Sequence, residues 1–218
     1  MNPKPLRFAG IIFDMDNTLL RSHIDFARMK REVRELLLGF GVMEEETAWD
    51  RHTTVTMIDS ARSHRNYTDS VDRAVWRRVA AIEEEGMAGA DLEPGVAECL
   101  EAISGKLVLT VLTNNADAAA FKALRETGID RYFAKVVGRD GTTALKPAPD
   151  GVQRILRQYE AIPPHRWLSV GDSWIDGMAA QLAGVPFVAY GPGAARMEER
   201  EVRPLGAIEA MYELMRFL

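Results

Sequence analysis

The chain has 218 residues, enough for one domain or for one domain carrying a smaller insertion. It is 47% hydrophobic and 27% charged, a composition typical of a globular protein with a sizeable core. The formal net charge of −5 argues against a broad nucleic-acid-binding surface, and no apolar stretch approaches the ~20 residues of a membrane-spanning helix. We therefore expect neither nucleic acid nor membrane as a partner.

Cysteine usage and the N-terminal residues favour a cytoplasmic location. Cys99 is the only cysteine, so no internal disulfide can form, which fits a reducing compartment. Its surroundings have a helical pattern of apolar residues, which favours a core position over a nucleophile. Residues 1–6 are polar and proline-rich, unlike a signal peptide.

The first predicted element is a buried strand that ends at two carboxylates. Residues 9–13 are apolar and are followed by Asp14 and Asp16. Such a run indicates a strand buried on both faces, and open α/β sheets bind ligands beyond the carboxyl ends of their strands. Two like charges this close repel each other, so we expect a cation, a bound proton or both at this point.

Residues 22 to about 90 predict helices and no clear strand. The first helix has apolar residues at three- and four-residue steps, forming one stripe: Phe26, Met29, Val33, Leu36, Leu37 and Phe40. A weaker second helix is predicted over 47–61, and Thr68 is expected to cap a third helix. The polar segment 62–67 is expected to be a solvated loop; substrate contact through Arg62, His64 and Arg65 is the alternative.

Strands and helices alternate from about residue 92 to the end of the chain. Strands are predicted over 106–113, 134–138, 167–171 and 186–190. Helices are predicted over 94–103, 115–127, 150–159, 174–183 and 206–218. This alternation indicates a parallel sheet with right-handed crossovers. The fold class is therefore α/β, a doubly wound, Rossmann-like sheet formed by residues 1–20 and 92–218, with an inserted all-helical cap formed by residues 21–91.

Further polar residues follow the predicted strands. Thr113-Asn114-Asn115 ends one strand, and Asn115 is expected to cap the next helix. If the strands are parallel, six polar side chains share one edge of the sheet: Asp14, Asp16, Thr113, Lys146, Asp172 and Asp176. The set matches the requirements of phosphoryl transfer, which are a nucleophilic carboxylate, a magnesium site, a cation and a hydroxyl for phosphate oxygens, and an acid/base carboxylate.

Four of these segments resemble, in order, the motifs of the haloacid dehalogenase superfamily. They are Asp14-Met-Asp16-Asn-Thr18, Thr113 at a strand end, Lys146-Pro147, and the segment 171–184, which begins Gly-Asp172-Ser-Trp-Ile-Asp176. The helical insertion after the first motif resembles the C1 cap of the phosphoglycolate-phosphatase-like branch. An aspartate at position 16 argues against the dehalogenase branch, which lacks that carboxylate.

This resemblance implies a role for each residue of the reaction. Asp14 would be the nucleophile and Asp16 the general acid/base. Thr113, the backbone amide of Asn114, and Lys146 would bind phosphate.

The resemblance also implies a magnesium site. Asp14, the backbone carbonyl of Asp16, and Asp172 would bind Mg²⁺. Asp176 would support the metal site or Lys146.

Two departures from the family pattern concern the loop after the first strand. Asn17 replaces a common glycine, and asparagine tolerates unusual backbone angles. Many relatives carry Asp-Ser where this chain has Arg21-Ser22. A basic residue at the entrance to the cap puts phosphoglycolate itself in doubt as the substrate.

We therefore expect a Mg²⁺-dependent phosphatase, monomeric or homodimeric, that forms an aspartyl phosphate. Its substrate would be a small phosphorylated metabolite that is phosphoglycolate-like, a sugar phosphate or a nucleotide monophosphate. Alternatives are a phosphomutase of the same fold, similar to β-phosphoglucomutase, and a non-catalytic phosphate-binding protein. A phosphonate-cleaving lyase would need a cap lysine, and Lys30 is the only one available.

Overall fold

The structure is a computed structural model that describes residues 6–45, 49–192 and 197–218. The chain divides into two compact units, Met1–Ser22 with Gly89–Leu218, here called the sheet unit, and His23–Ala88, here called the helical unit. The divisions lie within three residues of the boundaries drawn from the sequence pattern. Within the described ranges, no helix is both long enough and apolar enough to cross a bilayer.

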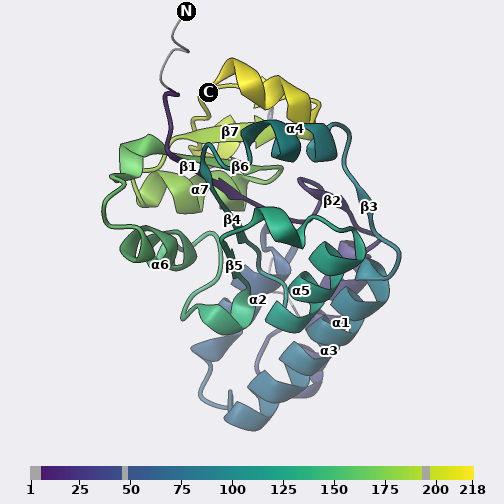
Figure 1. Ribbon diagram of the computed structural model, residues 1–218. Coiled ribbons are helices and arrows are strands. Elements are labelled where there is room, and N and C mark those ends of the chain that lie inside the picture. The colour runs from purple at the N-terminus through teal and green to yellow at the C-terminus, as the bar shows by residue number, and fades with distance from the viewer. Residues whose placement is uncertain (1–5, 46–48, 193–196) are drawn as a thin grey trace, which may run out of the picture. The chain divides into compact units, whose positions relative to one another are not determined.

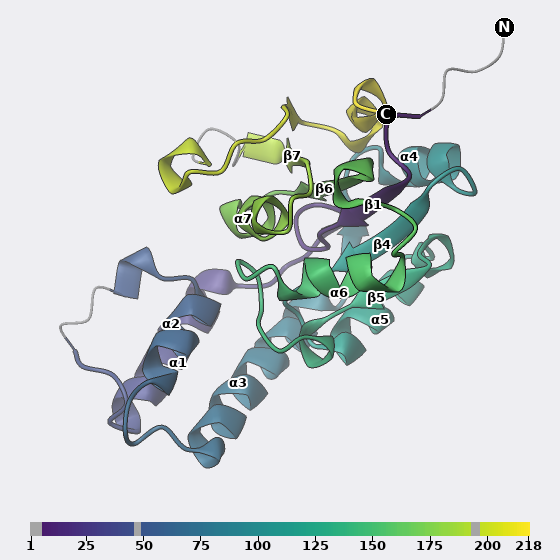
Figure 2. The same ribbon diagram turned by 90° about the vertical axis from the view of Figure 1, so that its left-hand side faces the viewer.

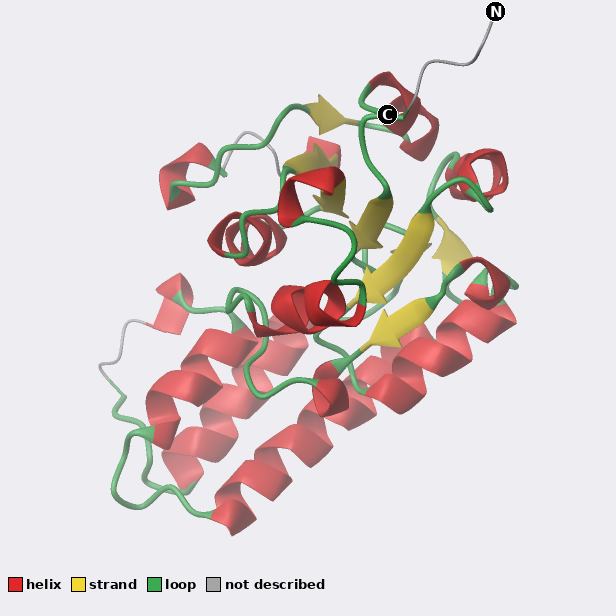
Figure 3. Ribbon diagram, turned by 60° about the vertical axis from the view of Figure 1, so that its left-hand side comes forward, coloured by secondary structure: helices red, strands yellow, loops and turns green. Residues whose placement is uncertain are grey.

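The sheet unit is built on a six-stranded parallel sheet with the strand order β5-β4-β1-β6-β7-β8 (Figures 1 and 3). The strands are β1 (Gly10–Phe13), β4 (Val108–Leu112), β5 (Lys135–Val137), β6 (Trp167–Gly171), β7 (Phe187–Tyr190) and β8 (Ala207–Ile208). Strands β1, β6 and β7 are buried along their whole length, as expected for a sheet covered on both faces. The predicted doubly wound α/β fold is confirmed.

The strand order reverses direction at β1. The chain runs outward from β1 through β4 to β5, then returns to the other side of β1 and continues through β6, β7 and β8. Doubly wound sheets bind their ligands beyond the carboxyl ends of the strands at such a reversal, which here are β1 and β6. The topology therefore singles out the residues that follow these two strands.

Helices cover both faces of the sheet (Figure 2). Helices α6 (Asp150–Gln158) and α7 (Trp174–Leu182) pack on one face, and α4 (Val96–Ile103) and α5 (Asp117–Glu126) lie on the other. The core under α6 and α7 includes Trp167, which is fully buried. Cys99 in α4 is also buried, and burial raises the pKa of its thiol to about 11, so it is a core residue as predicted.

A two-stranded antiparallel ribbon lies at the point where the chain leaves and re-enters the sheet unit. It pairs β2 (Leu20–Arg21) with β3 (Asp91–Leu92). Arg21, the basic residue noted in the sequence, lies with its Nε 3.7 Å from Oε1 of Glu93, just after β3. Glu93 also accepts a hydrogen bond from the buried Tyr190. Arg21 therefore takes part in a polar cluster within the sheet unit.

The predicted helix over 206–218 is wrong. Ala207 and Ile208 form β8, which pairs with β7, and only Met211–Arg216 is helical, as a 3₁₀ helix. Pairing with the open edge of β7 supplies backbone hydrogen bonds that outweigh the local helical pattern.

The helical unit consists of α1 (Phe26–Gly39), α2 (Thr54–Arg62) and α3 (Asp69–Met87). The middle of the predicted α1 stripe, Met29, Val33 and Leu37, is buried, whereas Phe26 and Phe40 at its ends are exposed. The Thr68 side chain caps α3 as predicted.

The second helix is shorter than the predicted 47–61. It starts after Thr53, whose side chain forms a capping box with Thr56. Trp49–Arg51 is a separate 3₁₀ turn, and residues 47 and 48 lie outside the described ranges.

Two glycines of the helical unit differ in the space around them. A Cβ added at Gly86 in α3 would lie 2.4 Å from the backbone Cα of Ile24, whereas a Cβ at Gly39 in α1 would meet nothing within 4 Å. We expect Gly86→Ala to destabilise the protein by ~1–3 kcal/mol through overpacking. Gly39→Ala should be neutral or stabilising by up to ~1 kcal/mol. The free energies of unfolding of the two variants are compared by urea unfolding followed by circular dichroism. Equal urea midpoints for Gly86→Ala and Gly39→Ala would contradict the close contact between Gly86 and Ile24.

Candidate active site

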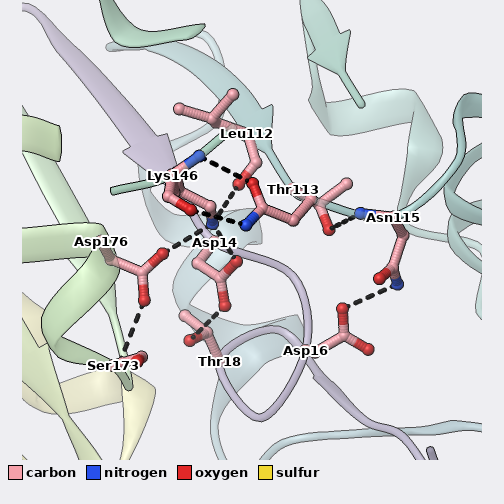
Figure 4. Close-up of polar contacts among 10 residues, drawn as sticks. Asp14, Asp16, Thr18, Leu112, Thr113, Asn115, Lys146, Ser173 and Asp176 are labelled. Atoms are coloured by element: carbon pink, nitrogen blue, oxygen red, sulfur yellow. Dashed lines mark hydrogen bonds and ion pairs between the residues drawn. The ribbon is translucent and has the colours of Figure 1, made fainter. Parts of the chain in front are cut away.

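Asp14 follows β1 directly and is held at both carboxylate oxygens. Its backbone N–H donates to the carbonyl oxygen of Val170 in β6 at 2.8 Å, which continues the pairing of β1 with β6. Oδ1 accepts from Nζ of Lys146 at 2.5 Å, and Oδ2 accepts from Oγ1 of Thr18 at 3.2 Å (Figure 4). Asn17, between these groups in the sequence, has φ of 55°, which fits the expectation that asparagine tolerates this turn.

Lys146 is buried at the centre of the site, with 4% of its surface exposed. Its ammonium group donates to Oδ1 of Asp14 at 2.5 Å, to Oδ1 of Asp176 at 2.6 Å and to the carbonyl oxygen of Leu112 at 2.9 Å (Figure 4). Three acceptors match the three protons of an ammonium group, so the buried charge is fully hydrogen-bonded. Lys146 thereby links the ends of β1 and β4 to helix α7.

The residues after β4 hold the backbone on either side of this lysine. The Asn114 side chain accepts from the Lys146 N–H at 3.0 Å and donates to the Lys146 carbonyl oxygen at 3.0 Å. Thr113 is buried, and its Oγ1 accepts from the backbone N–H of Asn115 at 3.2 Å. The predicted phosphate-binding residues Thr113, Asn114 and Lys146 therefore lie together at the end of β4.

Three carboxylates converge beside Lys146. Asp14, Asp172 and Asp176 each offer an oxygen, and these oxygens lie within 4.8 Å of one another. Asp176 can approach because Gly171 has no side chain, since a Cβ there would lie 2.5 Å from the Cβ of Asp176. A set of carboxylate oxygens is the donor chemistry that Mg²⁺ prefers, so these residues fit a divalent metal site.

The electrostatics of the cluster also favour a cation. Burial, with repulsion from Asp14 and Asp176, raises the pKa of Asp172 to about 8. Burial and repulsion from Asp14 raise the pKa of Asp176 to about 6, despite its bond to Lys146. Burial alone would lower the pKa of Lys146, but Asp14 and Asp176 outweigh it and raise that pKa. One ammonium group would thus leave three ionised carboxylates with uncompensated negative charge, and burial together with this charge is why the pKa values of Asp172 and Asp176 are raised.

The structure brings most of the sequence-predicted residues together, with one difference. Asp14, Lys146, Asp172 and Asp176 meet at the reversal point of the sheet. The Asp16 carboxylate faces another way in the same region, and its Oδ2 accepts from the Nδ2 amide of Asn115 at 2.8 Å (Figure 4).

Sequence reasoning missed two residues of the site. The first motif contains Thr18 but predicts no role for it, and a hydroxyl side chain four residues after Asp14 is the sequence signal that points to it. The prediction that Asn115 caps a helix is wrong, because the cap position of α5 is Ala116, and the N–H of Asp117, the first residue of the helix, donates to Oδ2 of Asp140 at 3.1 Å. Asn115 instead uses its amide for Asp16.

Arg62 anchors the start of loop 62–67 in the helical unit through its side-chain contacts. Its guanidinium pairs with Asp59 and Asp72 and lies over the ring of Trp76, 5.9 Å from the ring centre. His64 lines a hollow of about 270 Å³ within this unit, together with His52.

The comparisons with known proteins agree with this geometry. The sequence model of the haloacid dehalogenase-like hydrolases matches residues 11–190. A phosphoglycolate phosphatase from Mesorhizobium japonicum is 32% identical over 207 residues, which cover 91% of this chain and 89% of that protein. One from Rhodobacter capsulatus is 34% identical over 124 residues, covering 55% of this chain and only 54% of that protein.

Solved structures share the fold. A hydrolase from Pseudomonas syringae superposes with a TM-score of 0.70 at 20% identity, covering 95% of this chain and 96% of that one. Strand order, strand-end residues and the family match lead to one assignment. The chain belongs to the haloacid dehalogenase-like hydrolases, in their phosphoglycolate-phosphatase-like branch.

Proposed function

We propose that this hydrolase is a Mg²⁺-dependent phosphatase that cleaves a small phosphomonoester through an aspartyl phosphate on Asp14, with the helical unit as its cap domain. The observation that carries the proposal is the environment of Asp14. Its carboxylate is buried at the reversal point of the sheet, oriented by Lys146 and Thr18, and stands beside Asp172 and Asp176.

In the first step, an Asp14 oxygen attacks phosphorus, and the bond from phosphorus to the substrate's ester oxygen breaks. Asp16, in its protonated form, gives its proton to that leaving oxygen, so an alcohol departs. Thr113, the Asn114 amide and Lys146 are proposed to bind the phosphoryl oxygens as charge builds on them. The products of this step are the free alcohol and the phosphorylated Asp14.

In the second step, water hydrolyses the aspartyl phosphate. Asp16, now ionised, takes a proton from the water as the water oxygen attacks phosphorus. The bond between phosphorus and Asp14 breaks, inorganic phosphate leaves, and both aspartates return to their starting forms. One carboxyl group thus serves as acid and then as base.

The proposed metal ligands are Asp14, the backbone carbonyl of Asp16, and Asp172, with Asp176 supporting Lys146 and the metal site. Mg²⁺, when bound, would neutralise the carboxylates and the phosphate and would orient the phosphate. The raised pKa of Asp172, caused first by burial and then by its acidic neighbours, supports this assignment, because it reflects a charge that lacks a counterion.

The substrate class is proposed from the relatives and from the reaction. The matched relatives are named phosphoglycolate phosphatases, which makes phosphoglycolate the first compound to test, followed by sugar phosphates and nucleoside monophosphates. A cytoplasmic location and a monomeric or homodimeric state complete the proposal.

The first test is phosphate release from this panel with Mg²⁺ or with EDTA. We expect release in Mg²⁺, loss of release in EDTA, and a loss of ~10³-fold or more in Asp14→Asn, because removing a nucleophile abolishes the covalent route. Asp130→Asn, the same change at an exposed aspartate, should retain full activity.

Two outcomes would contradict the proposal. Undiminished turnover in Asp14→Asn would exclude an aspartyl phosphate at this position. Isomerisation of a sugar phosphate without net phosphate release would instead identify a phosphomutase.

The second test uses stability in EDTA as a function of pH. Since the pKa of folded Asp172, about 8, exceeds the ordinary aspartate value of ~3.9, protonation of Asp172 favours the folded state. That contribution is complete below about pH 4 and is lost as the pH rises to about 8. We therefore expect the melting temperature of the metal-free wild type to fall over this range relative to that of Asp172→Asn, which lacks the titrating carboxyl group.

Adding Mg²⁺ at pH 8 should raise the melting temperature of the wild type, because a ligand that binds only the folded state stabilises it. The gain should be much smaller in Asp172→Asn and unchanged in Asp130→Asn. A pH dependence and a Mg²⁺ effect that are identical in all three proteins would contradict a metal site at Asp172.

A further inference from the structure

Asn115 makes a contact that the reaction described above does not use. It lies after β4, only 5% exposed, and its Nδ2 donates to Oδ2 of Asp16 at 2.8 Å. The two residues are 99 positions apart in the sequence and come from the ends of neighbouring strands, β1 and β4. Figure 4 shows the Asp16 carboxylate turned toward Asn115, while the Asp14 carboxylate is turned toward Lys146.

The backbone of Asn115 is held on both sides. Its N–H donates to Oγ1 of Thr113 at 3.2 Å, and its carbonyl oxygen accepts from the N–H of Arg139 at 2.8 Å. The side chain is not used to cap α5, whose cap position is Ala116. Asn115 therefore presents its amide to Asp16 from a fixed position.

An acid/base carboxyl group works only if it faces the oxygen that receives or gives the proton. Asp16 lies in a turn between β1 and β2, where Asn17 has φ of 55°, and a bond from outside this turn restrains its side chain. An asparagine amide is suited to this task, because it stays neutral at every working pH and adds no charge to a site that already holds one ammonium group and several carboxylates.

We propose that Asn115 is a positioning residue for Asp16: its amide fixes the direction in which the acid/base carboxyl group faces. This inference rests on the proposed function, in which Asp16 protonates the leaving oxygen. It predicts that removing the amide impairs proton transfer to the leaving group and spares the attack by Asp14.

Two matched substrates separate these effects. Phenyl phosphate has a poor leaving group that needs a proton, whereas 4-nitrophenyl phosphate has a good leaving group that does not. We expect Asn115→Ala to lower kcat/KM in saturating Mg²⁺ by ~10–100-fold for phenyl phosphate and by less than ~3-fold for 4-nitrophenyl phosphate. Asn115→Leu, which keeps the size of the side chain and removes the donor, should show the same selective loss of kcat/KM on phenyl phosphate. Gln153→Ala, which removes an exposed amide from α6, should change neither value.

A double-mutant cycle with Asp16→Asn, measured on the best substrate of the panel, gives an independent readout. If Asn115 acts through Asp16, Asn115→Ala costs little further activity once Asp16 is asparagine. Additive losses in the cycle, or equal losses on both aryl phosphates, would overturn the inference, because a general structural defect produces both.

The same experiment distinguishes the two proposals. If Asp16→Asn shows the selective loss on phenyl phosphate and Asn115→Ala does not, the positioning role is wrong and the proposed function stands. If Asp16→Asn itself shows no selective loss, the acid/base role of Asp16 fails, and the inference about Asn115 fails with it.

Discussion

The site depends on one buried ammonium group. Lys146 is removed from water at a cost that its three acceptors, Asp14, Asp176 and the Leu112 carbonyl, must offset. These acceptors come from the end of β1, from α7 and from the end of β4, so the charge is satisfied only when three separate elements meet. The same contacts orient Asp14, and an ionised Asp172 beside Asp14 and Asp176 would carry an unbalanced charge. Stability and reactivity are therefore linked through this single cation.

The parallel sheet explains why these elements meet. Strand order reverses at β1, which pairs in parallel with β4 on one side and with β6 on the other, so the carboxyl ends of these three strands lie side by side at one edge of the sheet. Gly171 then allows Asp176 to approach the end of β6 where any larger residue would collide. The fold supplies the position and the rigidity, while the chemistry comes from the few residues placed at the strand ends.

The helical unit has a different kind of organisation. Its three helices bury their own apolar stripes, and Arg62 ties the loop 62–67 to its neighbours through Asp59, Asp72 and Trp76. A loop held in this way is a structural part of the unit, and the engagement of Arg62 favours the structural interpretation of that residue over a substrate contact. Specificity depends on the shape of such loops, and the residue types alone do not determine that shape.

The sequence by itself determined the doubly wound fold and the residues at its strand ends, because buried strands, helical stripes and caps such as Thr68 are encoded within short segments. Tertiary structure decided which groups touch. The Asp16–Asn115 bond joins residues 99 apart and depends on the alignment of β1 with β4, and β8 forms only because β7 offers it an edge. Periodicity is a local property of the chain, whereas a hydrogen bond between two strand ends exists only once the strands have paired.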